Sequence, residues 1–116
     1  MRIRTDIFVS ALTRRVFSAG GFAAVENKGA EEAGAVFIRQ RFRDGTENLY
    51  APAPQNVFDA DEAGERRFEK RLDRAEPSAV EELITGERRF DRDLWVVELE
   101  VEAIDGLFAV VDAEAG

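Results

Sequence analysis

The sequence predicts an α+β fold: a mostly antiparallel sheet of five or six strands with two helices packed on one face. Apolar residues recur at helical spacing in 6–19 and 79–88. They alternate with polar residues in the strand-like parts of 35–51 and 94–111, and each of these segments contains an Asp-Gly pair typical of a hairpin turn. The chain has 116 residues, 45% of them hydrophobic, so we expect a single domain over 1–116.

The first helix is expected over 6–19. Thr5 can cap its first turn, and Gly20 with Gly21 ends it, because glycine terminates helices. Its apolar stripe consists of Phe8, Leu12, Val16 and Ala19. The residues that follow, 22–26, are predicted to form a short strand.

The first hairpin is expected over 35–51, with a two-residue turn at Asp44 and Gly45. This turn sets Arg39 opposite Tyr50. One face then carries Phe37, Arg39, Arg41, Arg43, Asn48 and Tyr50. The other face, which is the expected core face, carries Val36, Ile38, Phe42 and Leu49. A three-residue turn with a bulge would move this register by one residue and change both sets.

The middle of the chain is expected to contain an acidic loop over 55–65. The apolar spacing in 66–73 fits either a helix or a strand, and we prefer a strand. The second helix, over 79–88, begins at a capping box in which Ser78 and Glu81 satisfy the first backbone groups.

The closing hairpin is expected over 94–111. Its first strand presents an apolar face made of Trp95, Val97, Leu99 and Val101. Asp105 and Gly106 form the turn, so 107–111 should fold back as an apolar edge strand. An exposed apolar edge invites a strand from another chain.

The composition excludes several kinds of active site. The chain has no Cys and no His, so disulfides, zinc-thiolate sites and the usual nucleophile–histidine pairs are excluded. Neither a phosphate-binding GxxxxGK[ST] loop nor a GxGxxG fingerprint occurs, and the 24 acidic residues single out no acid–base pair. We therefore assign no catalytic residue, no metal ligand and no cofactor, and we favour a protein that is not an enzyme.

The charge and the N-terminal sequence bear on partners and location. The net charge of −8 repels nucleic-acid phosphates, so a nucleic-acid partner is not expected. Arg14 and Arg15 resemble a twin-arginine export motif, but the apolar stretch after them is short and contains Gly20 and Gly21. No segment approaches the roughly 18 apolar residues that span a bilayer. We expect a cytoplasmic protein that does not contact membranes.

Two short patterns resemble metal sites. Residues 59–64 begin like a calcium-binding loop, but Ala63 and Lys70 stand where two of the ligands belong. Glu26 and Lys28 have the spacing of some metal-dependent nucleases, without a second carboxylate that the sequence identifies. A solvated acidic loop and a charged turn explain both patterns better.

Two arrangements of arginine could bind an anion. One is the arginine and tyrosine face of the first hairpin, and the other is the repeated Gly-Glu-Arg-Arg-Phe of 64–68 and 86–90. The candidate anion- or nucleic-acid-binding residues are Arg39, Arg41, Arg43, Tyr50, Arg66, Arg67, Arg88 and Arg89. We favour the structural alternative for the repeat, in which Phe68 and Phe90 anchor the core while the arginines pair with carboxylates.

Several phrases of the sequence also carry a family resemblance, namely 4–9, 44–46 with 49–55, 65–69, and 87–91 with 93–98. Together they resemble a small alphaproteobacterial family catalogued as domain of unknown function 1491, over nearly the whole chain and in order. The resemblance implies no activity, so it transfers no functional residue. Arg92 departs from the family pattern, which has a proline there, and the apolar stretch after Glu102 is longer than usual.

These observations lead to three hypotheses of function. The first is a non-catalytic interaction module that binds another protein or associates with itself, possible as a homodimer. The alternative is a binder of anions, nucleotides or nucleic acid through the arginine and tyrosine face. The third is a carboxylate- or metal-dependent hydrolase.

Overall fold

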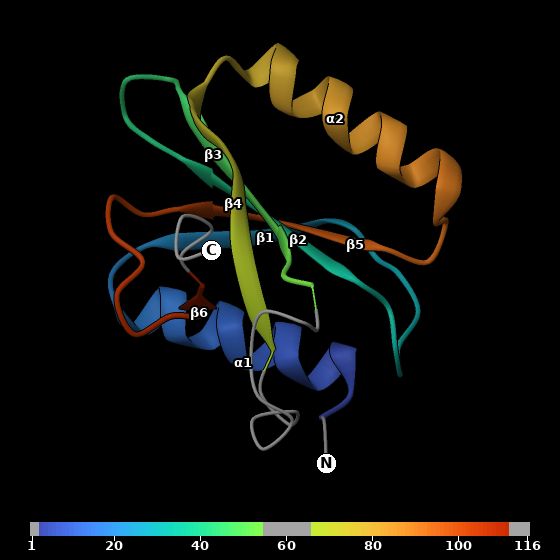
Figure 1. The fold of residues 1–116 in the computed structure, drawn as a ribbon. Helices are drawn as coiled ribbons and strands as arrows, with labels where there is room; N and C mark the ends of the chain where they lie inside the picture. The colour runs from blue at the N-terminus through green and yellow to red at the C-terminus, as the bar shows by residue number, and fades with distance from the viewer. Residues whose placement is uncertain (1–2, 55–65, 112–116) are drawn as a thin grey trace.

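The structure, a computed structural model, describes residues 3–54 and 66–111. Its elements are α1 (Thr5–Ser18), β1 (Phe22–Asn27), β2 (Val36–Arg41), β3 (Glu47–Pro52), β4 (Arg67–Ala75), α2 (Pro77–Phe90), β5 (Trp95–Glu100) and β6 (Ala109–Val110). The strands form one sheet in the order β1-β5-β2-β3-β4-β6. Three neighbouring pairs are antiparallel, and the pairs β2–β5 and β4–β6 are parallel. The predicted α+β class and the mostly antiparallel six-stranded sheet are confirmed (Figure 1).

The two helices cover opposite faces of this sheet, so the prediction that both pack on one face is wrong (Figure 1). Leu12 and Val16 of α1 pack against one face, and Val80 and Ile84 of α2 pack against the other. Alternate residues of the central strands serve the two cores: Val36, Ile38, Tyr50, Trp95, Val97 and Leu99 face α1, whereas Phe37, Leu49, Ala51 and Val96 face α2. A sheet buried on both sides has no polar face from which the helix side can be predicted.

The first hairpin has a three-residue turn, and this overturns the predicted register. Phe42 N donates to Thr46 O at 3.0 Å, and Gly45 adopts a φ of +90° that suits glycine. Ile38 therefore lies opposite Tyr50, and Arg39 opposite Leu49. Because side chains alternate between faces, the one-residue shift places Arg39 and Tyr50 on opposite sides of the sheet.

The expected hairpin over 94–111 does not form. β5 ends at Glu100, and its neighbours in the sheet are β1 and β2. The chain then turns at Gly106, whose φ is +80°, and brings the two residues of β6 beside β4 in a parallel pair. The Asp-Gly turn is real, but the strand that follows pairs with a distant element because Leu107 is buried against α1.

Neither helix begins with the predicted side-chain cap. Thr5 lies inside α1, where its Oγ1 donates to Gly34 O at 2.9 Å. α2 begins at Pro77, a favoured first helical residue, and Glu81 binds Arg39 instead of closing a capping box. In the described part of the chain neither helix is long and apolar enough to cross a membrane.

The segment between the first hairpin and α2 is described only in part. β4 makes 66–73 mostly strand, as preferred from the sequence. The expected acidic loop 55–65 and the calcium-like pattern within it lie outside the described residues.

Candidate functional site

A buried group of charged side chains lies on the α2 side of the sheet, with Arg39 at its centre. Arg39 donates from Nε to Glu47 Oε1 at 2.7 Å and from Nη1 to Glu81 Oε2 at 2.6 Å and Glu26 Oε1 at 3.2 Å. Its side chain is 6% exposed, and that of Glu47 is fully buried. Burial lowers the pKa of Arg39, but the hydrogen bonds to Glu47 and Glu81 more than offset this and raise it. Arg39 therefore joins β1, β2, β3 and α2 instead of facing solvent.

Arg41, two residues further along β2, extends this group towards solvent. Its Nε donates to Glu47 Oε2 at 2.9 Å, and its Nη1 lies 3.0 Å from Glu98 Oε2. We call this set the charge cluster: Glu26, Arg39, Arg41, Glu47, Glu81 and Glu98. With two cations and four carboxylates (2 − 4 = −2), the cluster does not attract an anion. The predicted anion-binding role of Arg39 and Arg41 thus lacks support from their surroundings.

Glu98 is the member of the charge cluster whose proton affinity is displaced. Burial, together with hydrogen bonding to Glu26 and the negative charge of Glu26, raises the pKa of Glu98 to about 7, although Arg41 opposes the shift. Two carboxyl groups that share a proton in this way titrate as a pair. The chemistry available here is the uptake of one proton near neutral pH.

The proton on Glu98 predicts a pH-dependent stability. A glutamate in the unfolded chain loses its proton near pH 4.5, whereas folded Glu98 holds it to about pH 7. Its contribution to the free energy of unfolding is therefore greatest below about pH 4.5 and declines as the pH rises through 7. We expect Glu98→Gln to stabilise the fold by about 2 kcal/mol near pH 8 and by much less near pH 5, measured by urea unfolding.

The matched control for this prediction is Glu82→Gln, because Glu82 is an exposed glutamate on α2 outside the charge cluster. It should leave the pH dependence of the unfolding free energy as it is in the native chain. An unchanged pH dependence in Glu98→Gln would contradict the assignment.

The predicted surface of Arg39, Arg41, Arg43 and Tyr50 does not form. Tyr50 is 2% exposed and lies on the α1 side, where its hydroxyl donates to Gln40 Oε1 at 3.1 Å. Its ring meets Phe108 edge to face at 5.1 Å. Arg43 is exposed in the turn. The predicted aromatic platform for a base is therefore part of the core.

The two arginine pairs of the repeated motif lie on opposite layers and do not enclose an anion together. Arg66 Nη2 donates to Thr5 Oγ1 at 2.7 Å, and its guanidinium lies 5.5 Å from the Phe8 ring centre on the α1 side. Arg67 begins β4. Arg88 and Arg89 are in the last turn of α2.

The two phenylalanines of the repeat also differ. Phe68 is 1% exposed in the core, whereas Phe90 is 92% exposed. The expectation that both anchor the core is correct for Phe68 and wrong for Phe90, because α2 ends at Phe90 and the side chain projects beyond the packed surface.

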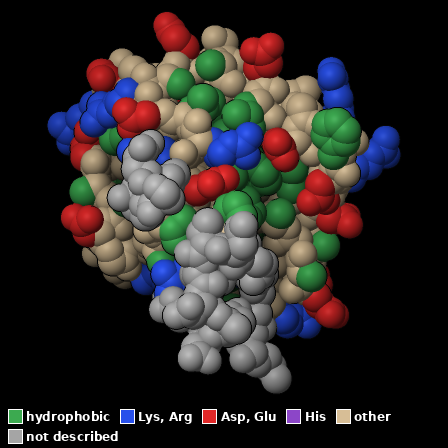
Figure 2. Space-filling model, in the orientation of Figure 1, with side chains coloured by type: hydrophobic (Ala, Val, Ile, Leu, Met, Phe, Trp, Pro, Cys, Tyr) green, Lys and Arg blue, Asp and Glu red, His purple; other side chains and the backbone are tan. Residues whose placement is uncertain are grey.

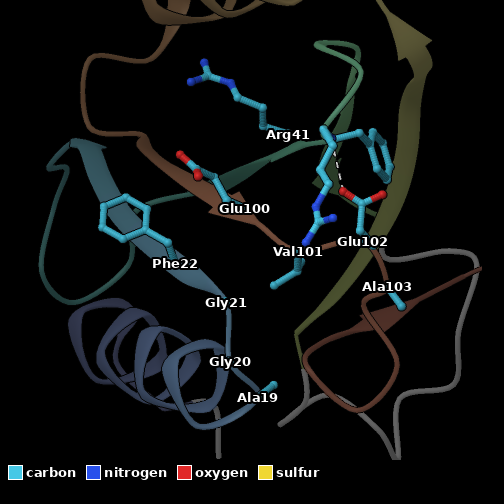
Figure 3. A pocket seen from close by; sticks show the side chains of 11 residues that line it. Ala19, Gly20, Gly21, Phe22, Arg41, Glu100, Val101, Glu102 and Ala103 are labelled. Atoms are coloured by element: carbon cyan, nitrogen blue, oxygen red, sulfur yellow. Dashed lines mark hydrogen bonds between the residues drawn. The ribbon is translucent and has the colours of Figure 1, made fainter.

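A groove of about 730 Å³ lies where β5 and β2 end and β1 begins (Figure 3). Gly20 and Gly21 form one wall, and Arg41, Glu100 and Glu102 contribute charges of both signs. Glu102 is held in place, since its Oε2 accepts a hydrogen bond from the backbone N of Arg43 at 3.1 Å (Figure 3). The walls therefore favour no single charge type of small ligand.

The outer edge of β1 is the largest feature that the sequence did not reveal. β1 is the first strand in the sheet order, and no described strand pairs with its outer edge. Phe22 and Val25 of β1 are 47% and 42% exposed, and Phe17 of α1 is 53% exposed with its ring 5.8 Å from Phe22. β6, expected as the open edge, has only two residues. The apolar spacing of 22–26 predicted a strand but not its place in the sheet.

The remaining surface shows no competing metal site. Within residues 3–54 and 66–111 no group of three acidic side chains is arranged to hold a metal ion, and this includes Glu26 near Lys28. On the face drawn in Figure 2, acidic and basic side chains are interspersed.

The fold and the site together define a small α+β protein with a charge cluster between sheet and helix and an open apolar strand edge. The chain belongs to the DUF1491 family: the family model, described as a protein of unknown function, matches residues 3–109. No protein with a curated description matches.

Solved structures of similar proteins agree with this assignment. Protein Atu0922 from A. tumefaciens, solved in solution, is 59% identical with a TM-score of 0.86, and the match covers 97% of each chain. A DUF1491 family protein from Caulobacter crescentus, solved as a crystal structure, is 30% identical with a TM-score of 0.77 over 97% of this chain and 100% of that one. A solution structure of a DUF1491 family protein from the same organism is 32% identical, with a TM-score of 0.76 over 97% of this chain and 99% of that one.

Proposed function

We propose that this protein is a non-catalytic interaction module whose β1 edge pairs with an extended segment of a protein chain, with a second copy of itself as the simplest partner. The observation that carries the proposal is an outer strand edge with three exposed apolar side chains, Phe17, Phe22 and Val25. Unpaired backbone N–H and C=O groups on such an edge supply hydrogen bonds to an added strand, and the apolar side chains supply buried area.

The shape of β1 limits how a partner can dock. The pairing of β1 with β5 shifts register between Val25 and Asn27, which is a bulge. Bulges interrupt strand pairing, so 22–25 is the segment available to a partner. In an antiparallel pair centred on Ala24, the two Glu26 side chains lie at opposite ends, so like charges do not meet.

The alternative functions have less support. The anion-binding face of the first hairpin is not assembled, because Arg39 and Tyr50 lie on opposite sides of the sheet. A carboxylate-dependent hydrolase would use acids that face an open site, whereas the displaced Glu98 is 13% exposed and bound to Arg41.

Self-association can be measured by sedimentation velocity over about 1 μM to 1 mM. We expect a reversible dimer whose Kd rises at least about tenfold in Val25→Lys, because a lysine on the edge opposes strand addition. Phe22→Ser should weaken the dimer in the same direction. Amide exchange of 22–25 should slow as the protein concentration rises.

Phe90→Ser is the matched control for Phe22→Ser, since it removes an even more exposed phenylalanine from α2. It should sediment as the native chain does. A chain that stays monomeric at about 1 mM, or a dimer unaffected by Val25→Lys, would refute pairing through this edge.

A further inference from the structure

A hollow of about 450 Å³ lies on the outer side of the C-terminal half of α2, and arginine side chains line most of it. The lining residues are Thr85, Arg88, Arg89 and Arg92. Thr85, Arg88 and Arg89 stand at helical positions i, i+3 and i+4, which share one side of a helix. Arg92 follows just after the helix ends, in the turn before β5. Helical spacing thus brings three guanidinium groups to one place.

The three arginines differ from most others in the chain because their charges are not compensated. Arg88, Arg89 and Arg92 form no ion pair or hydrogen bond with any residue in 3–54 or 66–111. Acidic residues are close in sequence, but none lines the hollow. The Asp91 carboxylate instead accepts a hydrogen bond from Asp93 N at 2.9 Å. Three like charges at one hollow repel one another until a counter-charge arrives.

The helix end accounts for part of this arrangement. Cations near a helix C-terminus are favourable because the backbone carbonyls there carry partial negative charge. This effect explains basic residues in the last turn, such as Arg88 and Arg89. It falls off within one turn and does not require Arg92 to border the same hollow.

We infer that this hollow binds the phosphate group of a phosphomonoester. Guanidinium groups donate two parallel hydrogen bonds to a phosphate, and the Thr85 hydroxyl is a further donor at the same wall. A dianionic phosphate can use more than one guanidinium, whereas a single carboxylate is satisfied by one. The site stands on a different surface from the β1 edge, so it does not rest on the proposed function.

The test is a nuclear magnetic resonance titration of the 15N-labelled chain at constant ionic strength. The probes are inorganic phosphate, AMP and a short-chain phosphatidate, which share the phosphate group and differ in what it is attached to. We expect saturable amide shifts centred on 85–93 with a Kd of roughly 1 mM. AMP binding more tightly than the other two points to a nucleotide, and phosphatidate doing so points to a lipid headgroup.

The variant Arg89→Gln with Arg92→Gln should raise the Kd at least about tenfold. The matched control is Arg14→Gln with Arg71→Gln, which removes the same charge from exposed arginines on α1 and β4. It should bind phosphate as the native chain does. The inference is overturned if phosphate gives no saturable shift, if the shifts lie elsewhere, or if both double variants weaken binding equally.

Discussion

Replacing Arg39 with leucine is expected to lower the free energy of unfolding by about 3–5 kcal/mol. The substitution leaves Glu47, which is fully buried, with Arg41 as its remaining cation, and it removes the links to Glu26 and Glu81. Removing one partner of a buried ion pair leaves a charge without compensation, and this costs more than the pair itself contributes. Urea unfolding at pH 7 measures the change.

Arg43→Leu is the control, because Arg43 is exposed in the adjoining turn, and it should change stability by less than about 0.5 kcal/mol. Combining Arg39→Leu with Glu47→Leu should recover part of the loss, since no buried carboxylate is then left facing leucine. A loss in Arg39→Leu as small as that of the control would mean that Arg39 is not structural and would return it to the candidate ligand-binding residues.

Replacing Phe68 with alanine is expected to cost about 3–5 kcal/mol, while Phe90→Ala should cost less than about 0.5 kcal/mol. Phe68 is 1% exposed, with its ring centre 5.9 Å from that of Phe8 and 5.3 Å from that of Phe108, so a cavity would open between α1, β4 and the C-terminal segment. Phe90 is 92% exposed and leaves no cavity. Thermal and urea unfolding of both variants measures the difference.

This pair of variants tests whether the two halves of the repeated motif have different roles. Similar losses from both would show that Phe90 is packed in solution. A small loss from both would show that the ring contacts of Phe68 do not hold the core together.

The sequence predicted the elements better than their arrangement. Hydrophobic spacing located both helices and the strands because these patterns depend on residues within one turn or one pleat. Which face each helix covers depends on the path of the chain across the sheet. Phe37 and Ile38, adjacent and both apolar, contribute to different cores, so their sequence has no alternation that would indicate a face.

The candidate site was less predictable because its contacts are distant in sequence. Arg39 binds Glu26, Glu47 and Glu81, which belong to three other elements, and no local pattern marks them as its partners. A single extra residue in the turn before Thr46 then decided whether Arg39 and Tyr50 shared a surface. The open edge of β1 followed from the sheet order, which is likewise nonlocal.

The place of β5 in the sheet order also has a consequence for folding. β5 lies between β1 and β2 in space but follows both, and α2, along the chain (Figure 1). While a ribosome is still making the segment after α2, the strands already synthesised lack the one that joins β1 to the rest. Closing such long loops slows folding. The sheet should therefore assemble late in translation, and its N-terminal strand should be the last to gain protection from a protease.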